Sequence, residues 1–202
     1  MNPTVTQQVY PGGTYGTVPS PTIPNDLGTF IGWWDHVLDQ IKEYDGDTVV
    51  TATTDHTLYA HWGFPIKLTN VGANKCLNIY GDNLTSLSNG INVTLWSDSG
   101  TNEQRWLVKS VGTQRVVKSV IDPRFGLNVY RSGSPYNCNI HETCGNETDA
   151  LVNFISLGNG VIKIKLTNYD LYLTAASTSN GANVYWGAAS DSDLQKWTFE
   201  SY

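Results

Sequence analysis

Apolar and polar residues alternate over short runs along most of this chain. In residues 57–62, for example, alternation places Leu58, Ala60 and Trp62 on one face, and residues 29–34 form a similar apolar run. Alternation with a period of two is typical of half-buried β-strands. No extended stretch has apolar residues at helical spacing, and residues 37–44 have room for only about two helical turns. The pattern therefore predicts an all-β protein.

An internal repeat begins after Gly63. Each copy contains a strand-like word around a Leu, a second word that begins with Asn, and a closing word that reads Gln-x-Trp in two copies. The first words are residues 76–80, 126–130 and 172–176; the second are 92–96, 139–143 and 183–187; the third are 104–106, 150–152 and 195–197. In this alignment Val93, Ile140 and Val184 are equivalent, and the period lies in the mid-forties. The copies span about 64–111, 112–158 and 159–202.

One copy is too small to bury its apolar face alone, whereas three copies around a common axis can share a core and close a barrel. Trp106, Val152 and Trp197 close the three copies, and we expect them in that core.

These words resemble those of the ricin-type β-trefoil lectins. The match is nearly complete in the first copy, where residues 89–96 (Asn-Gly-Ile-Asn-Val-Thr-Leu-Trp) precede Gln104 and Trp106. The resemblance covers residues 64–202 and implies a β-trefoil fold and carbohydrate binding. In that family an Asp in the first word and an Asn before the Gln bind sugar hydroxyls, and an aromatic residue ending the second word stacks on the sugar ring.

Transferred copy by copy, the resemblance implies three unequal sites. The first and best would contain Asn78, Thr94, Trp96 and Glu103, with Asp82 and Asn102 nearby; alternation predicts that Thr94 and Trp96 point outward. The third would contain Thr174 and Tyr185, together with Asp191 or Asp193, and has Gly187 at the aromatic position. The second would contain Asn128, His141 and Asp149, and with Thr143 at its aromatic position we interpret it as a relic.

Residues 1–63 differ in character from the repeated region. Their words at 13–21, 30–33 and 58–62 resemble the internalin-type B repeat (Listeria/Bacteroides repeat), although the strand that usually opens that repeat is missing. This resemblance implies a small β-grasp-like module of the kind found in bacterial surface proteins.

Charge and composition narrow the function. The 12 Lys and Arg residues are scattered and the net charge is -6, which disfavours nucleic acid as a partner. No apolar run is long enough to insert in a membrane, and no secretory signal follows Met1, so an exported parent protein would be longer than this chain. No arrangement of nucleophile, base and orienting group is evident.

We expect a non-catalytic module without cofactor or metal. The module would belong to a larger secreted or cell-surface bacterial protein and would bind a glycan or polysaccharide, such as a host or cell-wall glycoconjugate. The alternative is a structural or protein-interaction module whose sugar sites have decayed.

Three cysteines, an odd number, cannot all pair within the chain. The spacing of Cys138, His141 and Cys144 does not converge on a tetrahedral metal without a fourth ligand. A disulfide between Cys138 and Cys144 is an alternative, if the intervening chain turns back. The resemblance implies that Cys76 is a free buried thiol, because Ser97 stands where its usual partner would be.

Overall fold

A computed structural model describes residues 6–18, 29–34, 43–44, 46–63, 65–111, 113–142 and 148–201. The chain divides into two compact units, Met1–Gly63 and Phe64–Tyr202. Every regular element in the described residues is a β-strand, apart from two 3-10 helices of three residues each. The prediction of an all-β protein is therefore confirmed. No helix in these described segments is long and apolar enough to span a membrane.

The first unit contains a small antiparallel sheet. Its central strand β1 (Thr29–Trp34) lies between β2 (Glu43–Tyr44) and β3 (Tyr59–Gly63). Glu43 and Tyr44 are thus extended rather than helical, and residues 37–42 of the possible helix lie outside the described residues. The membership of this unit in the B-repeat family stays a prediction.

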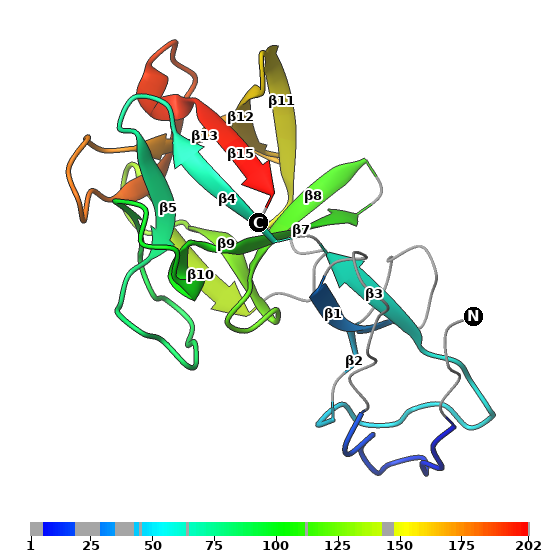
Figure 1. The fold of residues 1–202 in the computed structure, drawn as a ribbon. Coiled ribbons are helices and arrows are strands. Elements are labelled where there is room, and N and C mark those ends of the chain that lie inside the picture. Colours follow the sequence, from blue (N-terminus) through cyan, green and yellow to red (C-terminus); the bar gives the residue numbers. More distant parts are fainter. Residues whose placement is uncertain are drawn as a thin grey trace. The chain divides into compact units, whose positions relative to one another are not determined.

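The second unit is built around a closed barrel of six strands (Figure 1). These are β4 (Pro65–Asn70), β7 (Trp106–Val111), β8 (Gln114–Ser119), β11 (Val152–Gly158), β12 (Val161–Leu166) and β15 (Trp197–Ser201). Each pairs antiparallel with the next, and β15 pairs with β4 to complete the ring. Closure removes the exposed edges of the barrel sheet.

Three hairpins complete the trefoil. They consist of β5 (Lys75–Ile79) with β6 (Val93–Trp96), β9 (Phe125–Tyr130) with β10 (Tyr136–Glu142), and β13 (Leu171–Ala175) with β14 (Val184–Ala188). The hairpins contact one another through three equivalent backbone pairs: Asn92 with Asn139, Thr94 with Asn183, and Asn137 with Tyr185. The 3-10 helices η1 (Asn102–Gln104) and η2 (Asp193–Gln195) precede β7 and β15. The predicted β-trefoil is confirmed.

The predicted core positions are also confirmed. Trp106, Val152 and Trp197 are fully buried. The indole N–H of Trp106 donates to the carbonyl of Leu77, and that of Trp197 donates to the carbonyl of Leu173, each at 3.0 Å. Each Trp therefore fills the core and also attaches its barrel strand to the hairpin of its own copy.

Cys76 and Cys138 are buried free thiols. Burial raises the pKa of both, which keeps them neutral. The free thiol predicted for Cys76 is confirmed, whereas Cys138 does not form the alternative disulfide. Cys144 lies outside the described residues.

The strand register corrects the predicted alignment of the middle copy. Trp96 lies opposite Cys76, His141 opposite Gly126, and Gly187 opposite Tyr172. His141 is therefore equivalent to Trp96, and the prediction that Thr143 occupies this place was wrong. Likewise Asn137, and not Asn139, is equivalent to Asn92 and Asn183. The second copy consequently does have an aromatic ring where the first copy has Trp96.

Candidate functional site

The register defines three equivalent positions on each hairpin that can be compared between copies. The position opposite the middle of the second hairpin strand holds Asn78, Asn128 or Thr174. The ring position at the end of that strand holds Trp96, His141 or Gly187. The position three residues before Trp106, Val152 or Trp197 holds Glu103, Asp149 or Leu194. These sets decide what each copy offers a ligand.

In the first copy the ring is exposed but its polar neighbours are not. The side chain of Trp96 is 42% exposed, as predicted, whereas Thr94 is only 2% exposed. The prediction that Thr94 points outward to solvent was wrong, because both faces of β6 are covered: Val93 and Leu95 on the other face are buried as well. Asn78 is buried and donates from Nδ2 to the carbonyl of Ile79 at 2.7 Å.

Glu103 has a structural role in the first copy. It is buried, and its Oε1 accepts the backbone N–H of Leu84 at 2.6 Å. Burial by itself would raise the pKa of this carboxyl, but hydrogen bonds from the Thr101 side chain and from the N–H of Leu84 outweigh it and hold the pKa below its usual range. Glu103 is therefore ionised and attaches the loop that contains Leu84 to η1. Asp82 and Asn102, also predicted near this site, are exposed.

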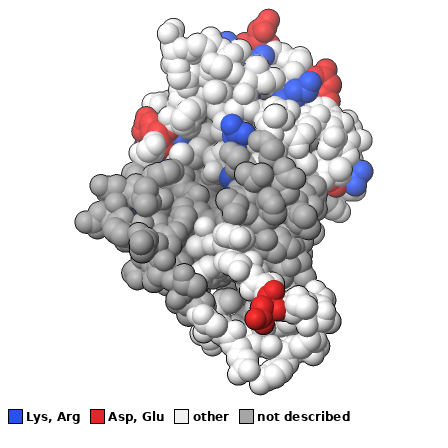
Figure 2. All heavy atoms as spheres, turned by 90° about the vertical axis from the view of Figure 1, so that its right-hand side faces the viewer, with Lys and Arg blue, Asp and Glu red and all other residues white. Residues whose placement is uncertain are grey.

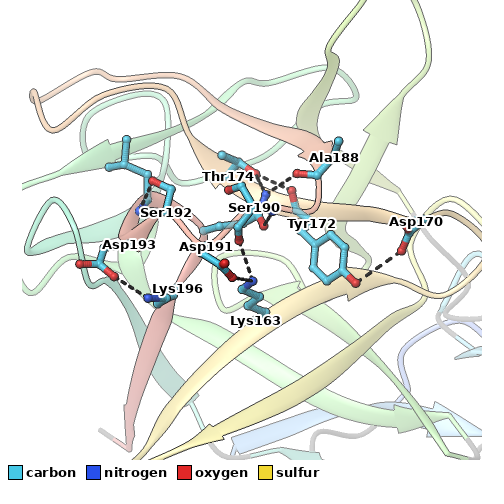
Figure 3. A network of polar contacts seen from close by, with 12 residues as sticks. Lys163, Asp170, Tyr172, Thr174, Ala188, Ser190, Asp191, Ser192, Asp193 and Lys196 are labelled. Atoms are coloured by element: carbon cyan, nitrogen blue, oxygen red, sulfur yellow. Dashed lines mark hydrogen bonds and ion pairs between the residues drawn. The ribbon is translucent and has the colours of Figure 1, made fainter.

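In the third copy, the polar side chains at the place equivalent to the other two sites bond to one another and to the backbone (Figure 3). Thr174 is buried; its hydroxyl donates to the carbonyl of Tyr172 at 2.7 Å and accepts from Nε2 of Gln195 at 2.9 Å. A Cβ at Gly187 would meet Cε2 of Tyr185 at 2.8 Å, so the half-buried Tyr185 ring covers the place of the missing aromatic. The hydroxyl of Thr174 already donates one hydrogen bond and accepts another, and its role in sugar binding stays a prediction.

The acidic residues of the third copy are paired with lysines. Asp193 accepts from Nζ of Lys196 at 2.7 Å, and Asp191 lies 3.9 Å from Nζ of Lys163, which also donates to the carbonyl of Ser190 at 2.6 Å (Figure 3). The contacts of Lys163 tie the loop before η2 to β12, and the pair of Asp193 with Lys196 joins the two ends of η2.

The second copy contains a surface recess of about 810 Å³. Its lining includes the three residues predicted for this site: Asn128, His141 and Asp149. The structure thus brings together the set that the sequence led us to interpret as a relic. Asn139, Tyr130, Arg131, Asn89, Gly90 and Glu142 also line the recess.

The polar atoms of this recess are oriented by hydrogen bonds. Nδ2 of Asn128 donates to Oδ1 of Asn139 at 3.0 Å, and within the described residues Oδ1 of Asn128 accepts no hydrogen bond. Nδ1 of His141 lies 2.9 Å from the carbonyl of Glu142, and because a carbonyl only accepts, Nδ1 donates this bond. Asp149 forms an ion pair with Arg131, whose Nη2 lies 2.9 Å from Oδ2 of Asp149. An amide oxygen, a ring and an ion pair therefore face one hollow, where they could bind hydroxyl groups.

Sequence reasoning missed Tyr130, Arg131 and Asn89 in this recess. Tyr130 and Arg131 directly follow Asn128 and Val129. The sequence did contain a signal for Tyr130, because the first word ends in Tyr in two copies, at Tyr80 and at Tyr130. Asn89 belongs to the first copy, so only the tertiary structure brings it to the second.

The charged side chains on the face drawn in Figure 2 are interspersed rather than segregated. On this face the described Lys and Arg side chains lie beside Asp and Glu. Among the described residues, Lys67 forms ion pairs with Asp98 at 2.7 Å and with Glu200 at 3.1 Å. This face presents no contiguous basic patch among the described residues.

No protein-family model and no curated protein matches the sequence. Solved structures share the fold. The designed three-fold symmetric protein ThreeFoil has a TM-score of 0.59 and 24% identity over 67% of this chain and 96% of its own. The Macrolepiota procera ricin B-like lectin, solved with lactose, has a TM-score of 0.55 and 16% identity over 68% of this chain and 95% of its own.

The C-terminal half of an earthworm R-type lectin, solved with GalNAc, has a TM-score of 0.53 and 17% identity over 69% of this chain and 99% of its own. The second unit has a lectin-like β-trefoil fold. At these identities the likeness establishes the fold alone, since one fold supports many functions.

Proposed function

We propose that this chain is a carbohydrate-binding, non-catalytic module of a larger secreted or surface bacterial protein. The observation that carries the proposal is that a side-chain amide and an aromatic ring recur at equivalent positions of two copies, as Asn78 with Trp96 and as Asn128 with His141. The second pair lines a recess, which offers a sugar more than one wall. The lectin-like fold, and the lactose and GalNAc with which two similar structures were solved, support the same function.

Each site has the chemistry that a sugar requires. The ring of Trp96 or His141 would cover the C–H face of a pyranose, and Oδ1 of Asn128, or of the more deeply buried Asn78, would accept a hydrogen bond from a hydroxyl. Neither amide carries the charge of a carboxylate, so each single site is expected to bind weakly, near millimolar or about 4 kcal/mol. Two sites on one trefoil, or several modules in one protein, would strengthen binding to a polysaccharide through effective concentration.

The test is a glycan array followed by calorimetric titration of the full chain with the saccharide that binds most strongly. Trp96→Ala and His141→Ala are each expected to remove one site, and the double variant to abolish binding. Phe199→Ala is the matched control, because Phe199 is also an exposed aromatic residue, 47% exposed, but lies on β15 of the barrel. Absence of binding by the wild-type chain at millimolar saccharide, or full binding by the double variant, would refute the proposal.

A second function is favoured by the third copy, where Tyr185 fills the ring position and Thr174 is fully engaged. Such a filled surface suits a structural or protein-interaction module. A chain that binds no glycan but retains a protein partner in the Trp96→Ala and His141→Ala double variant would support this alternative.

A further inference from the structure

The hairpins are joined across copies by Asn-Gly turns. The N–H of Gly181 in the third copy donates to the carbonyl of Leu95 in the first, at 2.8 Å. The same bond joins Gly90 of the first copy to Ile140 of the second, also at 2.8 Å. Leu95 and Ile140 immediately precede the ring residues Trp96 and His141. Each ring is therefore next to a turn that belongs to another copy.

The Asn of each turn is oriented by the backbone just after the ring. Oδ1 of Asn180 accepts the N–H of Ser97 at 2.9 Å and its hydroxyl at 3.0 Å. Oδ1 of Asn89 accepts the N–H of Glu142 at 2.6 Å. These bonds hold each oxygen against the neighbouring copy. Within the described residues Nδ2 of neither Asn has a hydrogen-bond partner, so both amide donors are available at the surface.

The glycines keep these turns close to the rings. Gly181 has φ +77 and Gly90 has φ +92, and residues other than Gly rarely adopt this backbone conformation. A Cβ at Gly181 would contact Cζ3 of Trp96 at 3.6 Å, so the turn lies directly beside the indole. In the second copy, Asn89 and Gly90 line the same recess as Asn128 and His141. The wall of this recess thus comes from two copies.

The third copy provides an internal comparison. Asn89 and Asn180 each stand three residues before the equivalent Asn92 and Asn183, and Ser134 stands three residues before Asn137. Ser134 and Pro135 therefore replace the Asn-Gly turn beside Gly187, where the ring is also missing. At two of the three equivalent positions a ring therefore lies beside an Asn-Gly turn of another copy, and at the Gly187 position both the ring and the Asn-Gly turn are absent.

We propose that each glycan site on this trefoil spans two copies, with Nδ2 of Asn180 beside Trp96, and Nδ2 of Asn89 beside His141, donating a hydrogen bond to a hydroxyl of the stacked sugar. This inference rests on the proposed carbohydrate binding. It adds two specificity-determining residues and implies that the first site uses the third copy, and the second site the first copy. A trefoil copy excised from the chain would lack part of its site.

The experiment isolates one site at a time. Asn180→Ala is made in a His141→Ala background, where only the Trp96 site can bind, and Asn89→Ala in a Trp96→Ala background. Each chain is titrated calorimetrically with lactose, with N-acetylgalactosamine and with the strongest saccharide of a glycan array. Loss of one neutral hydrogen bond predicts affinity weaker by roughly 3- to 10-fold. Ser134→Ala, the equivalent change in the second copy, whose turn lies beside Gly187, should leave the affinity of either background unchanged.

Nuclear magnetic resonance supplies a readout that a merely structural role would not move. The side-chain NH₂ signals of Asn180 and Asn89 should shift on addition of saccharide, while thermal unfolding of the Ala variants should show that the trefoil is intact. If the backgrounds bind sugar but the Asn variants bind equally well, the two-copy site is refuted and carbohydrate binding stands. If neither the wild-type chain nor the backgrounds bind any saccharide, carbohydrate binding itself is refuted, and the two-copy site with it.

Discussion

Three asparagines form a closed ring of hydrogen bonds between the hairpins of the trefoil. Nδ2 of Asn92 donates to Asn183 at 2.9 Å, Nδ2 of Asn183 donates to Asn137 at 2.9 Å, and Nδ2 of Asn137 donates back to Asn92 at 2.8 Å. All three side chains are half-buried. The ring connects one residue from each copy. Substitution of its members by Ala therefore probes how much the three-fold arrangement depends on polar contacts.

The geometry predicts an unequal series of losses. A net hydrogen bond of this kind contributes about 1 kcal/mol to the free energy of unfolding. Asn92→Ala removes two of the three bonds, so we expect a loss of about 2 kcal/mol. Adding Asn183→Ala removes the last bond, for a total of about 3 kcal/mol. The triple variant, which adds Asn137→Ala, removes no further bond and should equal the double variant. Water that replaces lost partners would reduce all three values together and preserve their order.

The measurement is urea unfolding of the full chain followed by near-ultraviolet circular dichroism, with the slope of the transition checked for constancy. Asn102→Ala serves as the control for stability, because Asn102 is exposed and its side chain makes no hydrogen bond within the described residues. The ring would be energetically unimportant if Asn92→Ala matched this control. A triple variant clearly less stable than the double variant would show that the bonds do not act as one closed set.

Two further predictions concern stability. Gln195→Ala removes three hydrogen bonds, to Ala188, Thr174 and Ser190, whereas Gln104→Ala removes two, to Ser97 and Ser99. Thermal unfolding should therefore show a larger loss of stability for Gln195→Ala, about 3 kcal/mol, than for Gln104→Ala, about 2 kcal/mol. Equal losses would argue against this count of bonds. The lowered pKa of Glu103 means that its contribution to stability is present above the ordinary value of 4.5 and is lost as the pH falls through the lower folded value. The free energy of unfolding, measured from pH 6 to about pH 3, should therefore fall less steeply for Glu103→Gln than for wild type. Parallel curves would contradict the structural role of the Glu103 carboxylate.

Much of the fold could be predicted because the core residues carry their own signals. The mid-forties period and the Gln-x-Trp words located Trp106 and Trp197, and Val152 was placed by its position in the repeat; all three are buried as predicted. Alternation also placed Trp96 at the surface. Alternation failed for Thr94, because it assumes that one face of a strand meets solvent, whereas in β6 Thr94 is buried as well as the core residues Val93 and Leu95.

The sequence by itself determined the architecture: three copies, their strands, and the residues that fill the shared core, because burial of apolar side chains requires a regular pattern. Only the tertiary structure decided which residues meet at the candidate site. Asn137 and Asn139 both fit the alternation, since a shift of two residues leaves every side chain on the same face of a strand. Pairing across the copies selected Asn137 and thereby placed His141 in the position of Trp96. The neighbours of those two rings, Asn89 and Asn180, come from other copies. Their Asn-Gly words recur in the sequence, but only the folded trefoil shows which ring each of them meets.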